Sequence, residues 1–274
     1  MTASKVGIRW TIGNVSRLGF DALRLSIWGA WNVFGPDAAY VVCVNSVPLG
    51  EARTLVGDVP EFIAWHESTR DEIPSFLNSH LDDALAEGVG WKFAPLEVFP
   101  DRFEIALDND CILWRMPTAI KRWLEFIDDQ TCVIAEDVLP CFGQFAHLCG
   151  PEPRNSGIRG LPPYFDFEGT LKRTLEENPV TMVSELDEQG LQVATTSRNR
   201  PPLVVAVDEV TICSPFPPHL PYLGKCGAHF VGLNVRDPSW EVDGKPAIVY
   251  IKENWDRFQQ DLCARVGVAT SGHT

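Results

Sequence analysis

The sequence has no uninterrupted apolar run long enough to cross a membrane, and residues 1–9 lack the apolar segment of a signal peptide. We therefore expect a cytoplasmic protein without a membrane segment. Basic residues are scarce, since 23 Lys and Arg face 37 Asp and Glu and leave a net charge of −14. This balance predicts no broad cationic surface for a nucleic-acid backbone. Small anionic ligands whose charge is neutralised by a metal ion are still compatible with this acidic charge balance.

Two nucleotide-binding signatures are also missing. The chain contains neither G-x-G-x-x-G nor the loop G-x-x-x-x-G-K-S/T, which argues against a dehydrogenase and against a P-loop ATPase. Its eight cysteines are scattered without a C-x-x-C pair, and several lie in apolar runs typical of strands. This distribution indicates buried free thiols rather than disulfides or a zinc site.

The first hundred residues alternate between strand and helix patterns. Apolar runs at 6–12, 38–45 and 62–65 predict strands, and apolar residues at helical spacing predict helices at 15–34 and 74–88. Strands that alternate with helices indicate a parallel sheet. With 274 residues, 45% of them hydrophobic, the chain can bury one large core, so we expect a single domain.

The run 102–113 is a further predicted strand, and it contains two carboxylates, Asp108 and Asp110, spaced i, i+2. In an extended chain both side chains point the same way, with Cα atoms roughly 6–7 Å apart. Both would then reach one divalent cation and hold it against a phosphate. Acid-x-acid triplets are common by chance in an acidic chain, and the alternative is that both carboxylates bind a turn or cap the next segment.

The rest of the chain is also a mixture of helices and strands. Helices are expected at 117–127, 167–177, around 187–191 and around 252–266. A strand is expected at 131–135, a Pro/Gly-rich connection at 150–163, and two short strands paired as a hairpin at 203–208 and 210–213.

Four short elements follow one another in a characteristic order. They are Asp108-Asn109-Asp110, Asn155-Ser156-Gly157, the pair Glu188-Gln189, and His229-Phe230-Val231-Gly232. In this order they resemble the GT-A-fold glycosyltransferases, particularly family 8, the glycogenin and galactosyltransferase type, over most of the chain. The resemblance implies an α/β fold, a three-layer α/β/α sandwich with a central, mostly parallel sheet. Residues 1–110 would form its nucleotide-binding half and residues 111–274 its acceptor side.

The resemblance also implies a reaction. A sugar would pass from a nucleotide-diphosphate sugar to an acceptor that the sequence does not identify, with retention of the anomeric configuration. Asp108, Asp110 and His229 would hold Mn²⁺ or Mg²⁺ together with the diphosphate. A hard cation prefers oxygen ligands, Mn²⁺ also accepts an imidazole, and the metal stabilises charge on the departing diphosphate.

The same resemblance implies the remaining site residues. Glu188 and Gln189 would be catalytic residues beside the sugar. Donor binding would involve Thr11, Ile12, Gly13, Lys92, Asn155 and Gly157. Each of these residues also has an ordinary structural interpretation, as part of a loop, a solvated helix face or a lysine that lies along the surface.

The chain departs from the family pattern at two places. In many relatives the late motif continues to Lys-Pro-Trp, whose lysine binds the diphosphate, whereas this chain continues to Asp237-Pro238-Ser239-Trp240. Diphosphate binding would then depend on Arg236 or Lys92. The second departure is Gly190, which stands where relatives usually have an acidic residue.

Two alternatives stay open at this point. The run into Asp108-Asn109-Asp110 also resembles the haloacid-dehalogenase phosphatases, with Asp108 as nucleophile and Asp110 as general acid. That family carries its nucleophile on an early strand, whereas about 100 residues come first here. The other alternative is a non-catalytic nucleotide-sugar-binding protein, which the missing lysine suggests. If configuration is inverted instead, the candidate bases are Glu136, Asp137, Asp187 and Glu188.

Overall fold

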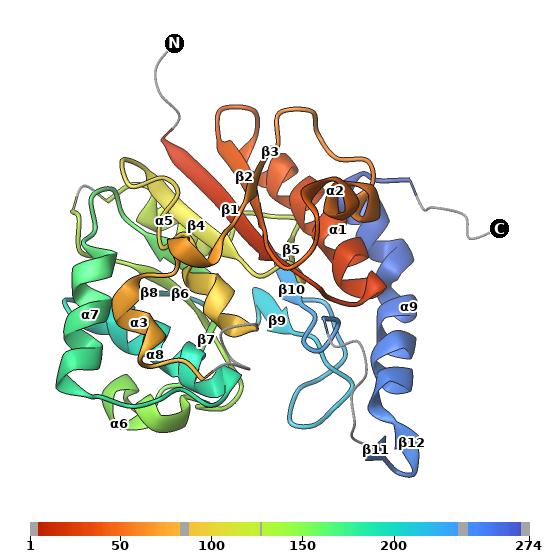
Figure 1. The fold of residues 1–274 in the computed structure, drawn as a ribbon. Helices are drawn as coiled ribbons and strands as arrows, with labels where there is room; N and C mark the ends of the chain where they lie inside the picture. Colours follow the sequence, from red (N-terminus) through yellow and green to blue (C-terminus); the bar gives the residue numbers. More distant parts are fainter. Residues whose placement is uncertain (1–4, 83–87, 127, 235–240, 270–274) are drawn as a thin grey trace.

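A computed structural model describes residues 5–82, 88–126, 128–234 and 241–269 (Figure 1). At its centre is a seven-stranded sheet in the order β3-β2-β1-β4-β7-β6-β8. The strands are β1 (Val6–Ile12), β2 (Ala39–Val44), β3 (Ala64–Glu67), β4 (Phe103–Leu107), β6 (Val133–Glu136), β7 (Arg154–Leu161) and β8 (Leu203–Val205). Only β7 runs antiparallel to its neighbours, so the sheet is mostly parallel, as predicted.

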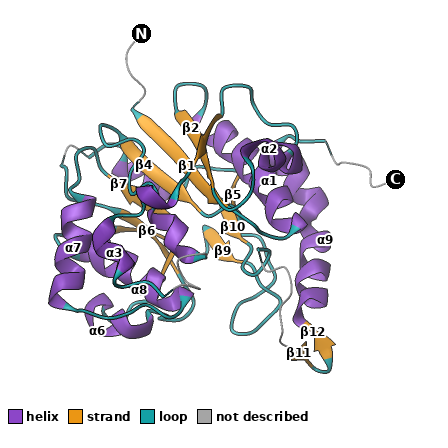
Figure 2. Cartoon of the chain, viewed as in Figure 1, coloured by secondary structure: helices purple, strands orange, loops and turns teal. Residues whose placement is uncertain are grey.

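Helices cover both faces of this sheet (Figure 2). On one face Ile8, Trp10 and Ile12 pack against α1 (Arg17–Phe34) in the largest hydrophobic core. The other face is covered by a second core that contains residues of α7 (Phe167–Glu177) and α8 (Glu185–Ser197). The predicted three-layer α/β/α sandwich is therefore confirmed. The described residues also form the helices α2 (Leu49–Val56), α3 (Ser75–Asn78), α5 (Thr118–Trp123), α6 (Ala146–Cys149) and α9 (Ala247–Val266), with short 3-10 helices η1 (Arg70–Glu72), η2 (Val89–Phe93) and η3 (Gly143–Phe145).

Helix α1 illustrates why the first half follows its sequence pattern. Its N-cap residue Ser16 accepts a hydrogen bond from Gly19, and Phe20, Leu23 and Ile27 form a buried stripe at helical spacing. The helix ends at Gly35, whose φ of 74° suits glycine. The predicted helix at 74–88 is interrupted, because α3 ends at Asn78 and residues 79–82 are not helical; residues 83–87 lie outside the described part.

Two smaller sheets complete the fold. Strands β5 (Cys111–Leu113), β10 (Gly227–His229) and β9 (Val210–Ile212) form a three-stranded sheet beside the carboxyl end of β4. Strands β11 (Glu241–Val242) and β12 (Lys245–Pro246) form a hairpin that projects beside the N-terminus of α9 (Figure 1). No helix in the described part of the chain is long and apolar enough to cross a membrane.

Two predictions about the second half are wrong. The predicted connection at 150–163 contains β7, which pairs with β4 and β6. Its glycines permit close packing, since a Cβ at Gly160 would lie 2.8 Å from the Trp123 ring. The predicted hairpin at 203–213 is absent, because β8 joins β6 in the central sheet whereas β9 joins β10 in the small one. Both errors concern partners that are distant in the sequence.

Candidate active site

A cleft of about 640 Å³ lies at the carboxyl ends of β1, β2 and β4. Residues that line it include Thr11 at the end of β1, Asn45 after β2, Asp108 after β4 and His229 at the end of β10. Strand β1 lies between β2 and β4, so the chain order of the sheet reverses there. In open α/β sheets ligands bind at such a switch point.

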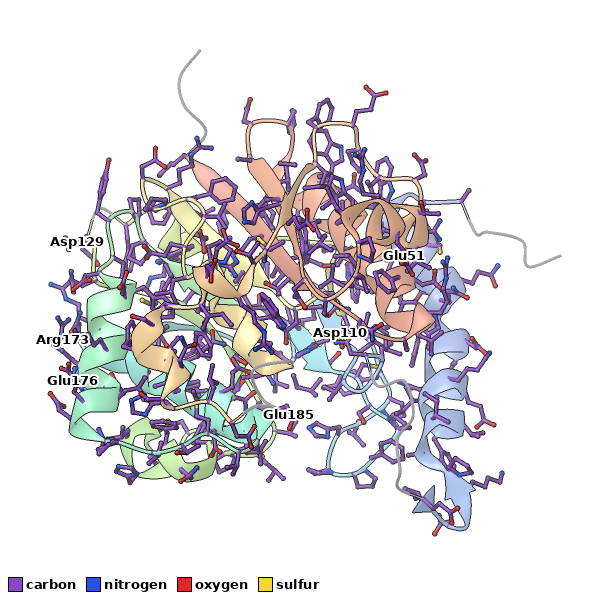
Figure 3. The ribbon with its side chains drawn as sticks, viewed as in Figure 1. Glu51, Asp110, Asp129, Arg173, Glu176 and Glu185 are labelled. Atoms are coloured by element: carbon purple, nitrogen blue, oxygen red, sulfur yellow. The ribbon has the colours of Figure 1, made fainter. Side chains whose placement is uncertain are left out.

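Asp108, Asp110 and His229 meet in this cleft. One ligand atom from each lies within 4.8 Å of the others. Nε2 of His229 is 3.2 Å from Oδ1 of Asp110 and 3.6 Å from Oδ2 of Asp108. Asp110 is labelled near the centre of Figure 3, where β10 approaches the carboxyl ends of the main strands.

The prediction of an extended Asp108-Asn109-Asp110 segment is wrong. The amide of Cys111 donates to the carbonyl of Asp108 at 2.9 Å, which makes these residues a turn between β4 and β5. The turn and the strand β10 converge, because the amide of Phe230 donates to the carbonyl of Asp110 at 2.9 Å. Backbone contacts therefore fix the positions from which the carboxylates and the imidazole extend.

The residues of this cluster fit a divalent cation. Oδ1 of Asp110 is buried and accepts no hydrogen bond from the described residues, although Nε2 of His229 lies nearby. Its other oxygen, Oδ2, accepts a hydrogen bond from Asn234 at 3.3 Å. A buried carboxylate oxygen with free lone pairs, a second carboxylate and an imidazole form a donor set that Mn²⁺ accepts.

Electrostatics in the cluster match this donor set. Burial lowers the pKa of His229, but the carboxylates of Asp110 and Asp108 more than offset that effect, so the pKa is raised overall. The two carboxylates thus favour the protonated form of the imidazole. A cation between them would supply the same compensation.

Lys92 on η2 adds a positive charge to the cleft. Its Nζ lies 3.1 Å from Oδ1 of Asp108 and 3.4 Å from Oε2 of Glu188. Burial lowers the pKa of Lys92, and the charges of Asp108 and Glu188 raise it by more, so the ammonium form is favoured. Arg236, the other predicted cation, lies outside the described residues.

Glu188 and Gln189 both line the cleft from the first turns of α8. Glu188 is 1% exposed, and burial raises its pKa although Lys92 lowers it. Nε2 of Gln189 donates to the carbonyl of Cys141 at 2.9 Å. Close packing explains why residue 190 is a glycine, since a Cβ there would lie 2.1 Å from the carbonyl oxygen of Phe142.

Asn155 and Gly157 on β7 have different positions. Asn155 lines the cleft, accepts from the amide of Gly157 at 2.7 Å and donates to Asp137 at 3.0 Å. Gly157 does not line the cleft and lies behind His229, where its Cβ would be 2.4 Å from the imidazole.

The predicted turn at Thr11, Ile12 and Gly13 lines the same cleft. The Ile12 side chain belongs to the hydrophobic core, so this residue offers its backbone. Gly13 allows the loops after β1 and β2 to touch, since its Cβ would lie 2.2 Å from Oδ1 of Asn45. Of the residues predicted as metal ligands, as catalytic residues or for donor binding, and described by the structure, all except Gly157 line this one cleft.

Other cleft residues were not predicted as binding residues. Asp137 was predicted only as a candidate base, and it lies 3.7 Å from His219. Asn234 and the buried pair Arg9 and Arg159 had no sequence signal, because their partners are distant along the chain. Two further candidate bases, Glu136 and Asp187, do not line the cleft and bind backbone amides: Glu136 accepts from Val207, and Asp187 accepts from Val183 and Gln144.

Comparison with known proteins identifies the fold. No protein-family model and no curated protein sequence matches the chain. The galactosyltransferase LgtC in complex with donor and acceptor sugar analogs superposes with a TM-score of 0.56 and 11% identity, over 97% of this chain and 98% of that one. An active-site mutant of LgtC gives 0.56 and 10% identity over 92% and 95%. The apo bifunctional glycosyltransferase WbbM gives 0.50 and 12% identity, over 96% of this chain and 52% of that one. The chain therefore has the GT-A fold of glycosyltransferases that the order of its motifs predicts.

Proposed function

We propose that the protein is a metal-dependent glycosyltransferase that uses a nucleotide-diphosphate sugar. The observation that carries this proposal is the meeting of Asp108, Asp110 and His229, with ligand atoms within 4.8 Å, in the cleft of a GT-A fold. Mn²⁺ or Mg²⁺ bound there would act as a Lewis acid on the diphosphate. The superposed LgtC structure was determined with donor and acceptor sugar analogs, which supports the same class of ligand.

Different residues of this chain would bind different parts of the donor. The backbone at 11–13 would bind the base and ribose, since it lies at the switch point of the sheet. The transferred sugar would lie against Asn155, Glu188 and Gln189, whose polar groups surround the same cleft. Buried amide and carboxylate groups suit the hydroxyl groups of a sugar, because they donate and accept in fixed directions.

Lys92 would replace the lysine that the late motif lacks. It is a cation in the cleft and contacts Asp108, one of the proposed metal ligands, at 3.1 Å. A positive charge at this position would stabilise the charge that develops on the leaving diphosphate. We also propose that the reaction retains the anomeric configuration, by analogy with family 8, so that no separate base is required.

The two alternatives compete unequally with this proposal. A haloacid-dehalogenase phosphatase is disfavoured, because the chain has the GT-A fold. A non-catalytic nucleotide-sugar-binding protein would use the same cleft and the same metal ligands. Turnover is therefore the property that separates it from the enzyme.

The test uses the purified chain with a panel of nucleotide-diphosphate sugars and Mn²⁺. We expect a nucleoside diphosphate to raise the unfolding temperature only when Mn²⁺ is present, and we expect one donor to release its nucleoside diphosphate. Absence of Mn²⁺-dependent stabilisation by every nucleoside diphosphate would refute the proposal. Stabilisation without release from any donor, with simple glycosides supplied as acceptors, would favour the binding protein instead.

A further inference from the structure

A series of polar contacts leads from the cleft into the interior of the molecule. It begins at Glu188, whose Oε1 accepts a hydrogen bond from Nε2 of Gln192, one turn further along α8. Oε1 of Gln192 in turn accepts from Nη1 of Arg159 at 2.9 Å. Arg159 lies on β7 and is 2% exposed, with its guanidinium 4.6 Å from the ring centre of Phe167. A buried arginine therefore contacts a proposed catalytic carboxylate through one glutamine.

The contacts continue from Arg159 and return to the cleft. Nη2 of Arg159 lies 4.0 Å from Oε1 of Glu104, and Nη1 of Arg9 lies 3.5 Å from the same oxygen. Arg9 also donates to the carbonyl of Lys92 at 3.4 Å. Nζ of the same Lys92 lies 3.4 Å from Oε2 of Glu188, so the contacts, together with the Lys92 residue itself, form a closed ring.

The donors and acceptors of the side chains determine how Gln192 is oriented between Arg159 and Glu188. An arginine can only donate hydrogen bonds, so the carbonyl oxygen of Gln192 must face Arg159. The NH₂ group of Gln192 then faces Glu188, and an NH₂ group can only donate. Glu188 must therefore accept at Oε1, while its Oε2 faces the ammonium group of Lys92. Arg159 thus determines which way Gln192 points and, through it, how the carboxylate of Glu188 is held.

Stability alone is a weak reason for this arrangement. Arg9, Glu104 and Arg159 are each at most 2% exposed, and buried ion pairs often stabilise a fold no better than apolar residues of similar size. Burial also lowers the pKa of Arg159, to about 10. Arg9 and Glu104 also bind backbone groups of the segment 95–99, whereas Arg159 donates to Gln192. The burial of Arg159 is better explained by the side chain that it orients.

We propose that Arg159 is a positioning residue, which fixes the carboxylate of Glu188 in the cleft through Gln192. This inference rests on the proposed function, because its main readout is turnover of a nucleotide-sugar. It adds that Arg159, a buried residue in the wall of the cleft, controls the catalytic step through its effect on Glu188.

The experiment compares Arg159→Met and Gln192→Met in the full chain, each alone and each combined with Glu188→Gln. Gln192→Met leaves the buried charges in place and keeps the test valid if Arg159→Met fails to fold. Arg173→Met is the control, since Arg173 lies on the outer side of α7 (Figure 3) and is 49% exposed. Activity is measured with Mn²⁺ and the donor that the wild type turns over.

We expect each single variant to lower kcat at least about tenfold with little change in KM for the donor. In the Glu188→Gln background, neither change should lower kcat further, because the group that they position is already altered. Equal losses with and without Glu188→Gln would overturn the proposal, since they would indicate a general structural effect. An unchanged kcat in both single variants would overturn it as well.

A crystal structure of Arg159→Met or Gln192→Met separates this proposal from the proposed function. If the wild type turns over no donor, the proposed function fails, and the position of Glu188 still tests the inference. We expect the Glu188 carboxylate to rotate away from its wild-type position. An unmoved carboxylate would overturn the positioning role whatever the activity.

Discussion

Gly157 and His229 adjoin so closely that no side chain fits at position 157. A Cβ there would lie 2.4 Å from Cε1 and 2.6 Å from Nδ1 of the imidazole. The carbonyl of Gly157 also accepts a hydrogen bond from the amide of Asp108 at 2.9 Å. One glycine on β7 thus supports two of the three proposed metal ligands without being a ligand itself.

The change Gly157→Ala should weaken Mn²⁺ binding at least about tenfold, because the added methyl group displaces His229 from the two carboxylates. Isothermal titration with MnCl₂ measures this. The control is Gly50→Ala, since Gly50 lies in α2 with nothing within 4 Å of its Cβ position. Unchanged affinity in Gly157→Ala would mean that His229 does not bind the metal.

The change Asp110→Asn should abolish the Mn²⁺-dependent stabilisation by nucleoside diphosphates and leave the fold intact. Oδ1 of Asp110 is buried and lies 3.2 Å from Nε2 of His229, so the negative charge that the substitution removes faces the other proposed metal ligand. Thermal shift with Mn²⁺ and UDP or GDP is the measurement. Asp261→Asn is the control, because Asp261 is an exposed partner of Arg265 on α9. If Asp110→Asn responds as the wild type does, the carboxylate is structural.

Glu97 should make stability depend on pH. Burial, together with the negative charge of Glu104, raises the pKa of Glu97 from 4.5 to about 7. Between these two pH values the folded protein therefore binds more protons than the unfolded chain. The contribution of Glu97 to the free energy of unfolding is fully present below about pH 4.5 and is lost as the pH rises through about 7. Because Glu97 is partly exposed, we expect about 1 kcal/mol rather than the full effect of the shift.

The variant Glu97→Gln isolates this contribution. At pH 5 its free energy of unfolding in urea should be close to that of the wild type. At pH 8 the difference should be larger, with Glu97→Gln more stable than the wild type. Glu176→Gln is the control, since Glu176 lies on the exposed side of α7 (Figure 3). A difference between Glu97→Gln and the wild type that stays constant from pH 5 to pH 8 would contradict the prediction.

Gly190→Ala should destabilise the protein by about 1–3 kcal/mol, because the added Cβ would lie 2.1 Å from the carbonyl oxygen of Phe142. The free energy of unfolding in urea measures the loss, with Gly50→Ala again as the control. Helix α8 carries Glu188 and Gln189, so activity should fall as well. A fully stable Gly190→Ala would show that the segment around Phe142 moves aside easily.

The sequence predicts those parts of the fold whose residues interact locally. Strand β1 has the predicted bounds, and α1 begins two residues after the predicted start, because apolar periodicity, Ser16 and Gly35 are local signals. Strand β7 was missed because its glycines resemble a connection, and its pairing with β4 depends on residues far away in the sequence. The same limit explains the wrong hairpin at 203–213.

In the candidate site, too, some features were predicted from the sequence and others were not. The order of motifs brought Asp108, Asp110 and His229 together as metal ligands, and the structure places them within reach of one ion. A turn at Asp108–Asp110 was considered only as the alternative, although the hydrogen bond from Cys111 to Asp108 that closes it is local. The hydrogen bond from Phe230 to Asp110, which brings β10 to this turn, joins distant segments and was not predictable. Arg159 was part of the predicted connection, and nothing in its neighbours indicates that it contacts Gln192.

The pairing of β5 with β10 has a further consequence for the proposed cation. His229 lies opposite Cys111 in this ladder, next to Asp110, so the fold itself closes the long loop between these residues. An ion bound as we propose would meet residues that the fold already holds together, without any need to order the chain. It could then enter with a donor and leave with the product while the protein stays folded. The ion would then bind and dissociate together with the nucleotide and would not be a permanent structural component of the protein.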